Sequence, residues 1–221
     1  MEGPVNARVA PMSGARRRLV DELRTKGISD PGVLRALELT PRHLFVPTGV
    51  RHRAYEDSAL PIGNSQTISQ PFVHARSLQL LALKPADRVL EVGTGSGYQT
   101  ALISHLAAAV YSVERIASLL DEARKAIELA EGRNIHLMCR DGTGGWPEHA
   151  PYDAIVVSAG SPTVPKPLVE QLADGGRLVT PVGNRDEQRL VMITRNGSRF
   201  VEQAFDPVKF VPLLGEHGWT E

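Results

Sequence analysis

The feature that most constrains the fold is an alternation of short apolar segments with amphipathic segments, which begins after Pro71. Repeated strand, helix, strand order predicts a parallel sheet with helices on both faces. Near the end of the chain, two alternating segments flank Asn196-Gly197, a strong hairpin signal, so the sheet should end in an antiparallel pair. The predicted strands are 88–92, 110–113, 135–139, 153–158, 177–182, 189–195 and 199–205, and the predicted helices are 72–83, 98–107, 116–131 and 166–172.

The first 71 residues follow a different pattern. Apolar residues at spacings of three and four predict helices at 16–26 and 31–39, separated by the stop and start signals Gly27 and Asp30-Pro31. Residues 41–72 contain four prolines and two glycines and have no sustained period. So long a stretch without regular elements is either a functional loop region or a wrong assignment.

Composition excludes several classes of protein. The 221 residues carry 25 basic and 25 acidic side chains, which argues against a wide basic face for nucleic acid. No apolar stretch approaches the ~18 residues of a membrane span, and no apolar segment follows the N-terminal arginines. The single cysteine, Cys139, excludes an internal disulfide and fits a reducing compartment. We expect a cytoplasmic monomer with neither nucleic-acid nor membrane partners.

A glycine-rich loop lies where open α/β sheets bind ligands. The segment 91–97 (EVGTGSG) ends the first predicted strand of the sheet and opens a helix. Glycines allow the backbone to turn sharply and to approach a ligand closely. The spacing departs from the G-x-G-x-x-G of pyrophosphate-binding loops. Taken alone, the loop is also typical of a tight strand-to-helix turn.

Acidic residues follow the next two strands. Glu114 ends the second strand, 21 residues after Gly93, where a carboxylate can accept hydrogen bonds from ribose hydroxyls. Asp141-Gly142 follows the third strand, where an acid can accept from an adenine amine. Together with the glycine loop, these residues describe one nucleoside pocket. An NAD-linked oxidoreductase and a non-catalytic nucleotide-binding module both remain open at this point.

This combination resembles the S-adenosylmethionine-dependent methyltransferases over about residues 72–205. The resemblance implies an α/β fold with a Rossmann-like, doubly wound, mostly parallel sheet of seven strands, preceded by a helical and loop extension. The glycine spacing and the lack of an obvious acid–base set weaken the oxidoreductase alternative. The cofactor-binding residues that the resemblance implies in this core are Glu91, Gly93, Thr94, Gly95, Ser96, Gly97, Glu114, Arg115, Asp141 and Gly142.

Methylation of nucleic-acid bases is disfavoured. The chain has no Asn-Pro-Pro-Tyr or Asp-Pro-Pro-Tyr element, and Cys139 follows Met138, so the Pro-Cys nucleophile of cytosine enzymes is absent. Aromatic residues make up only 5% of the chain, which leaves few platforms on which bases could stack. The acceptor must therefore be argued from other residues.

The segment 54–71 (AYEDSALPIGNSQTISQP) is far more specific than the glycine loop. With Pro41-Arg42, 45–47 (FVP), 151–155 (PYDAI) and 210–213 (FVPL), it resembles the protein-L-isoaspartate O-methyltransferase family from about Arg16 to Trp219. The resemblance implies methyl transfer from S-adenosyl-L-methionine to the free α-carboxylate of L-isoaspartyl residues in damaged proteins and peptides. The products are S-adenosyl-L-homocysteine and an ester that initiates repair through a succinimide. A methyltransferase that acts on another carboxylate is the nearer alternative.

The same resemblance assigns the remaining site residues. Ser69 is the active-site residue, whose hydroxyl holds the acceptor carboxylate or the nearby donor. The acceptor, with a pKa of about 3.3 to 3.7, is ionised at neutral pH, so no general base is required. No metal is expected, because the histidines lack ligand spacing. Further cofactor contacts are Gln66, Thr67, Ile68, Ser69 and His74, and the substrate peptide is bounded by Ile62, Gly63, Val211, Pro212 and Leu213.

The expected organisation is a flexible leader, 1–15, and a single methyltransferase domain, 16–221. Within the domain, 16–71 supplies the N-terminal helices and active-site loop, 72–205 the cofactor-binding core and 206–221 a substrate-side segment. Ser65 and Arg140 depart from the family, which usually has glycine at both positions, and Ser65 bears on the substrate range. Cys139, at the end of a predicted buried strand, is expected to pack as a small hydrophobic residue.

Overall fold

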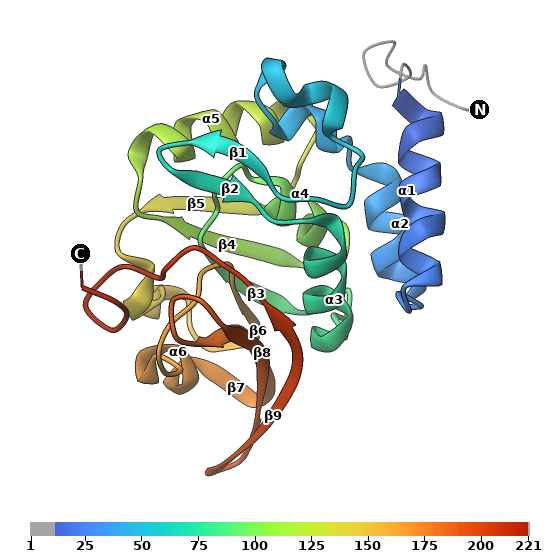
Figure 1. The fold of residues 1–221 in the computed structure, drawn as a ribbon. Helices are drawn as coiled ribbons and strands as arrows, with labels where there is room; N and C mark the ends of the chain where they lie inside the picture. Colours follow the sequence, from blue (N-terminus) through green and yellow to red (C-terminus); the bar gives the residue numbers. More distant parts are fainter. Residues whose placement is uncertain (1–11, 221) are drawn as a thin grey trace.

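The computed structural model describes residues 12–220 and has a seven-stranded sheet at its centre (Figure 1). The strand order is β5-β4-β3-β6-β7-β8-β9, parallel from β5 to β7 and antiparallel for β8 and β9. The predicted fold class is therefore confirmed, including the terminal hairpin, in which Asn196 pairs with Arg199. The strands are β3 (Arg88–Val92), β4 (Ala109–Glu114), β5 (Ile135–Cys139), β6 (Tyr152–Val157), β7 (Leu172–Gly183), β8 (Gln188–Asn196) and β9 (Arg199–Val208).

The helices begin close to the predicted signals. In α2 the Asp30 side chain accepts a hydrogen bond from Val33 N–H and Pro31 occupies the first turn, so both bounds agree with the prediction. Helix α1 begins at Ser13, so the last residues of the predicted leader are helical, and 1–11 lie outside the described residues. The helices are α1 (Ser13–Thr25), α2 (Pro31–Leu39), α3 (Pro71–Leu81), α4 (Tyr98–Ser104), α5 (Ala117–Leu129) and α6 (Lys166–Glu170). None of the helices between 12 and 220 is long and apolar enough to cross a bilayer.

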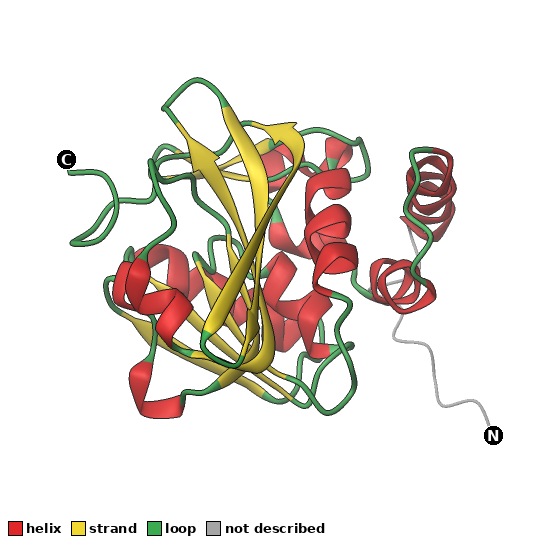
Figure 2. Ribbon diagram, turned by 90° about the horizontal axis from the view of Figure 1, so that it is seen from below, coloured by secondary structure: helices red, strands yellow, loops and turns green. Residues whose placement is uncertain are grey.

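Successive residues of the central strands point to opposite faces of the sheet, and each face packs in its own hydrophobic cluster. In β3, Val89 packs with residues of α1 to α5, whereas Leu90 packs with Leu168 of α6 and with Trp146. Figure 2 shows helices on both sides of the twisted sheet. Because both faces are covered, almost every residue of the central strands β3, β4 and β6 is buried.

The edge strand β5 shows why one prediction was wrong. Cys139, which we expected to be buried, is exposed, because β5 has a neighbour on one side only. The next residue, Arg140, pairs with Glu148 on the surface at 3.3 Å. Burial of a strand residue depends on the position of its strand in the sheet, which the strand's own residues do not reveal.

The segment 41–72 contains short elements rather than an unstructured loop. Two 3-10 helices, η2 (Arg42–Phe45) and η3 (Thr48–Arg53), precede a two-stranded sheet of β1 (Leu60–Gly63) and β2 (Gln66–Ile68). Asn64 and Ser65 form the turn between these strands, with φ of +49° and +56°. This turn favours glycine, which accounts for the residue usual in the family where Ser65 stands. Ser65 is exposed at the tip of the turn.

A buried guanidinium fastens this segment to the rest of the protein. Arg42 is fully buried and donates hydrogen bonds to the carbonyl oxygens of Ala54 at 2.6 Å, Ser58 at 3.2 Å and Ser69 at 3.1 Å. Its guanidinium also lies 5.7 Å from the centre of the Tyr98 ring. Burial lowers the pKa of Arg42. Arg42 thus links both ends of the 54–69 segment to the start of α4.

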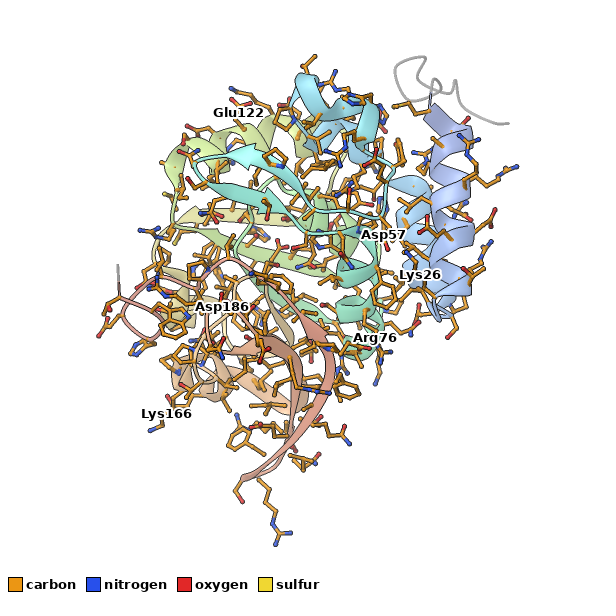
Figure 3. All side chains as sticks on the ribbon, viewed as in Figure 1. Lys26, Asp57, Arg76, Glu122, Lys166 and Asp186 are labelled. Carbon is orange, nitrogen blue, oxygen red and sulfur yellow. The ribbon has the colours of Figure 1, made fainter. Side chains whose placement is uncertain are left out.

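Asp57 fixes the same segment to two helices. Its carboxylate accepts a hydrogen bond from Phe72 N–H at 2.8 Å, in the first turn of α3, and pairs with Lys26 at 2.7 Å. Figure 3 shows Lys26 and Asp57 directed toward one another across the gap between α1 and this segment. The Asp57 side chain is only 6% exposed, whereas the Lys26 side chain is 41% exposed, so the ion pair lies at the protein surface.

Replacing Arg42 should destabilise the protein, because three carbonyl groups lose a charged donor. We expect Arg42→Met to lower the free energy of unfolding by about 2 to 4 kcal/mol, measured by urea denaturation. Arg35→Met is the matched control, because the Arg35 side chain is 67% exposed, and it should change stability by less than about 0.5 kcal/mol. Equal stability of the two variants would contradict the anchoring role.

Candidate active site

A cavity opens at the carboxyl ends of β3, β4 and β6, between the loops that follow them and the segments 62–69 and 211–214. Its empty space is about 820 Å³, including the part open to solvent. The predicted site residues that line it are Ile62, Gln66, Thr67, Ile68, Ser69, His74, Gly93, Thr94, Gly95, Ser96, Glu114, Arg115, Gly142, Val211, Pro212 and Leu213.

Four predicted site residues do not line this cavity: Gly63, Glu91, Gly97 and Asp141. Gly63 is exposed in β1. Gly97 has φ of +84°, and a Cβ there would lie 3.0 Å from Cδ1 of Ile127, so this glycine allows α4 to approach α5. It supports the site through helix packing.

Glu114 lies at the edge of the cavity with its carboxylate already oriented. One oxygen accepts from Gly95 N–H at 2.9 Å and the other from Ile116 N–H at 3.0 Å. The side chain is 6% exposed. Each carboxylate oxygen keeps a free lone pair, which can accept from a ribose hydroxyl. Glu114 therefore joins the glycine loop to the residue before α5 and remains available to a ligand.

Glu91 lies behind the cavity wall. Its carboxylate is fully buried and accepts from Thr100 Oγ1 at 2.5 Å, Ser112 Oγ at 2.6 Å and Gln99 Nε2 at 3.2 Å. Burial raises the pKa of Glu91 to about 7, although the three hydrogen bonds oppose the shift. All three partners are protein side chains, so Glu91 joins β3 to β4 and α4 beneath the cavity.

His74 is buried in the cavity wall and is neutral at pH 7. Its Nδ1 lies 2.8 Å from Gln99 Oε1, and because an amide oxygen only accepts, Nδ1 carries the hydrogen. Burial lowers the pKa of His74 to about 4. Its Nε2 is buried and has no hydrogen-bond partner among the described residues. A buried polar atom without a partner in a cavity wall indicates a place for a ligand.

Asp141 is bound to the C-terminal segment. One carboxylate oxygen accepts from the backbone N–H and the hydroxyl of Thr143, both at 2.8 Å, and the other accepts from Glu216 N–H at 2.9 Å. Partial burial raises the pKa of Asp141, but these hydrogen bonds outweigh it and lower the pKa overall. The neighbouring Gly142 lines the cavity, whereas a contact of Asp141 with a cofactor stays a prediction.

Eight residues of the cavity wall were not predicted from the sequence. Most follow a strand or begin a helix at the same edge of the sheet, so the rule that placed Glu114 could have found Ser158 after β6. Gln99, in the first turn of α4, has no signal in its neighbouring residues. The missed residues are Val92, Gln99, Val113, Ile116, Leu119, Ser158, Ala159 and Leu214.

A second, wider groove opens beside the cavity. Its empty space is about 1860 Å³, including the part open to solvent, and it runs between 182–189 and 207–211. Thr67, Ser69, Ser158 and Val211 line both the cavity and the groove, so the two spaces adjoin at these side chains. Within residues 12–220, no group of three or more His, Cys, Asp or Glu side chains could hold a metal ion.

The doubly wound sheet and its glycine-loop site define the class of α/β proteins that bind adenosine-containing cofactors. The sequence model described as protein-L-isoaspartate(D-aspartate) O-methyltransferase matches residues 14–218. The chain therefore belongs to the protein-L-isoaspartate O-methyltransferase family.

Relatives of the same name match nearly the whole chain. The chain is 50% identical over 210 residues to the protein-L-isoaspartate O-methyltransferase of Methanoregula boonei, covering 95% of this chain and 97% of that protein. It is 52% identical over 202 residues to that of Hahella chejuensis, covering 90% and 95%.

Two solved structures have the same fold. One protein-L-isoaspartate O-methyltransferase has a TM-score of 0.84 at 29% identity, covering 92% of this chain and 67% of that chain. A Plasmodium falciparum protein described as a protein-L-isoaspartate O-methyltransferase, solved in complex with S-adenosyl-L-homocysteine, has a TM-score of 0.79 at 27% identity. The match covers 90% of this chain and 98% of the Plasmodium falciparum protein.

The raised pKa of Glu91 makes stability depend on pH. The folded state holds the proton up to about pH 7 and the unfolded state up to about 4.5, so stability falls as pH rises between these values. The Glu91→Gln side chain does not titrate, so the variant does not lose this stability as pH rises. The free energy of unfolding of Glu91→Gln minus that of wild type should therefore increase between pH 5 and pH 8, by up to about 3 kcal/mol.

Urea denaturation at both pH values measures this difference. Glu122→Gln is the control, because the Glu122 side chain is 73% exposed, and its stability relative to wild type should be the same at both pH values. A Glu91→Gln difference that does not change with pH would show that Glu91 titrates normally.

Proposed function

We propose that this chain transfers the methyl group of S-adenosyl-L-methionine to the free α-carboxylate of L-isoaspartyl residues in damaged proteins and peptides. Family membership supports the activity. The observation that carries the proposal for this site is that Thr67 and Ser69 border both the cavity lined by the glycine loop and the open groove. A cofactor in the cavity and a peptide in the groove would meet at these hydroxyls.

The residues of the cavity fit S-adenosylmethionine. The backbone of 93–96 allows close approach, and Glu114 keeps lone pairs for the ribose hydroxyls. We assign Gly142 and Leu119 to the walls beside the adenosine. When bound, the cofactor supplies a sulfonium methyl group, whose transfer to a carboxylate oxygen leaves a neutral ester and S-adenosyl-L-homocysteine.

The protein's part in this chemistry is alignment and the exclusion of water. The acceptor carboxylate is ionised at neutral pH, so no residue has to remove a proton. The hydroxyl of Ser69 can donate a hydrogen bond to that carboxylate and fix its direction. Apolar side chains such as Ile62 and Leu213 limit water around the reacting groups. His74, with a pKa of about 4, stays neutral throughout.

Repair needs no second site on this chain. The neighbouring backbone amide nitrogen attacks the ester carbonyl, the ester C–O bond breaks and methanol leaves, and hydrolysis of the resulting succinimide returns some normal aspartate. The remaining proposals are a monomeric state, a cytoplasmic location and the absence of nucleic-acid or membrane partners. The zero formal net charge argues against a nucleic-acid partner, and the single cysteine fits a reducing compartment.

The test of the function is transfer of a labelled methyl group from S-adenosylmethionine to two peptides that differ only in carrying L-isoaspartate or L-aspartate. We expect label only in the isoaspartyl peptide. Ser69→Ala should lower kcat/KM roughly 10- to 100-fold, the effect of losing a hydrogen bond to a charged group. Ser198→Ala, in the exposed β8–β9 turn, is the control and should retain full activity. Equal labelling of both peptides would point to another carboxylate as the acceptor.

A further inference from the structure

Ser158 occupies the junction of the cavity and the groove, and neither the sequence motifs nor the reaction as described above uses it. It follows β6, and its backbone N–H donates to Val92 O at 2.8 Å, which fixes it beside the end of β3. A Cβ on Gly93 would lie only 3.5 Å from Cβ of Ser158, so the serine stands against the glycine loop. Ser158 and Ser69 both line the two spaces.

The direction of the Ser158 hydroxyl is set by Gln99. Gln99 Nε2 donates to Ser158 Oγ at 2.8 Å, so Oγ is an acceptor in this contact. Among residues 12–220, no acceptor for the Ser158 hydroxyl hydrogen is found in the hydrogen bonds of the structure. The hydrogen is therefore free to point to a ligand at the junction.

Gln99 is itself held in one orientation. Its side chain is 4% exposed, its Nε2 also donates to Glu91 at 3.2 Å, and its Oε1 accepts from His74 at 2.8 Å. In this orientation the amide N–H groups face Glu91 and Ser158, and the amide oxygen faces His74. The buried network thus keeps an N–H directed at Ser158 Oγ.

We propose that Ser158 is a second hydroxyl that holds the acceptor carboxylate, and that Gln99 is the positioning residue that turns the Ser158 hydrogen toward it. This inference rests on the proposed function. A carboxylate has two oxygens, so one can accept from Ser69 and the other from Ser158. Two donors fix the plane of the carboxylate as well as its position, which directs an oxygen lone pair at the methyl carbon.

The test is binding of an isoaspartyl peptide to enzyme saturated with S-adenosyl-L-homocysteine, measured by calorimetry. Ser158→Ala should weaken peptide binding roughly 10- to 100-fold, as expected for a hydrogen bond to a charged group. Its affinity for S-adenosyl-L-homocysteine should stay within about twofold of wild type. Ser158→Thr, which retains the hydroxyl, should restore peptide binding. Ser104→Ala removes a hydroxyl that is bonded to Ala101 O outside the site and serves as the matched control.

A double-mutant cycle separates positioning from simple structural support. Gln99→Met should weaken peptide binding in the wild-type background and have little further effect in Ser158→Ala, because Gln99 acts through that hydroxyl. The same Gln99→Met effect in both backgrounds would overturn the positioning role. Peptide binding by Ser158→Ala equal to wild type would overturn the role of Ser158 while leaving the proposed function intact. A wild-type enzyme that binds S-adenosyl-L-homocysteine but no isoaspartyl peptide would contradict both.

Discussion

The carboxylate of Glu91 is the group through which the parts of the site are joined. It lies fully buried at the end of β3 and receives hydrogen bonds from β4, through Ser112, and from α4, through Thr100 and Gln99. Gln99 extends the network to His74 in α3 and to the residue that follows β6. An acid in this position costs solvation, which its raised pKa reflects. The network nevertheless holds β3, β4, α4 and α3 in one arrangement around the cavity, although Glu91 itself does not line the cavity.

A second, independent set of contacts brings the proposed substrate side to this wall. The segment that carries Ser69 belongs to no strand of the main sheet, and it is fixed by Arg42 from within and by Asp57 at the start of α3. The proposed active site is thus assembled from a rigid sheet edge and a separately anchored segment. Such an arrangement suits a reaction that needs two charged reactants to be aligned and shielded from water but no proton transfer.

Much of this architecture could be predicted from the sequence, because it is encoded locally. The apolar strands, the Asp30-Pro31 start of α2 and the Asn196-Gly197 hairpin each depend on neighbouring residues. Glu114 could be placed because parallel strands share one carboxyl edge. The motif in 54–71 led to the family, although the short strands and 3-10 helices around it have no period to read.

The remainder depends on contacts between distant residues. The exposure of Cys139 follows from the edge position of β5, and the bond from Glu216 N–H to Asp141 joins residues 75 positions apart. Gln99 and Ser158 are 59 positions apart and carry no motif that would connect them. Gly97 likewise appears in the sequence as part of a ligand loop, whereas its closest neighbour is Ile127 of α5.

The central claim is that one cofactor cavity and one peptide groove meet at the hydroxyls of Ser69 and Ser158. A crystal structure of the protein with S-adenosyl-L-homocysteine and an isoaspartyl peptide tests it most directly. The account predicts the ribose at Glu114, the cofactor sulfur beside the junction, and the peptide's α-carboxylate within hydrogen-bond distance of both serines. A cofactor outside the glycine-loop cavity, or a carboxylate bound away from both hydroxyls, would contradict it.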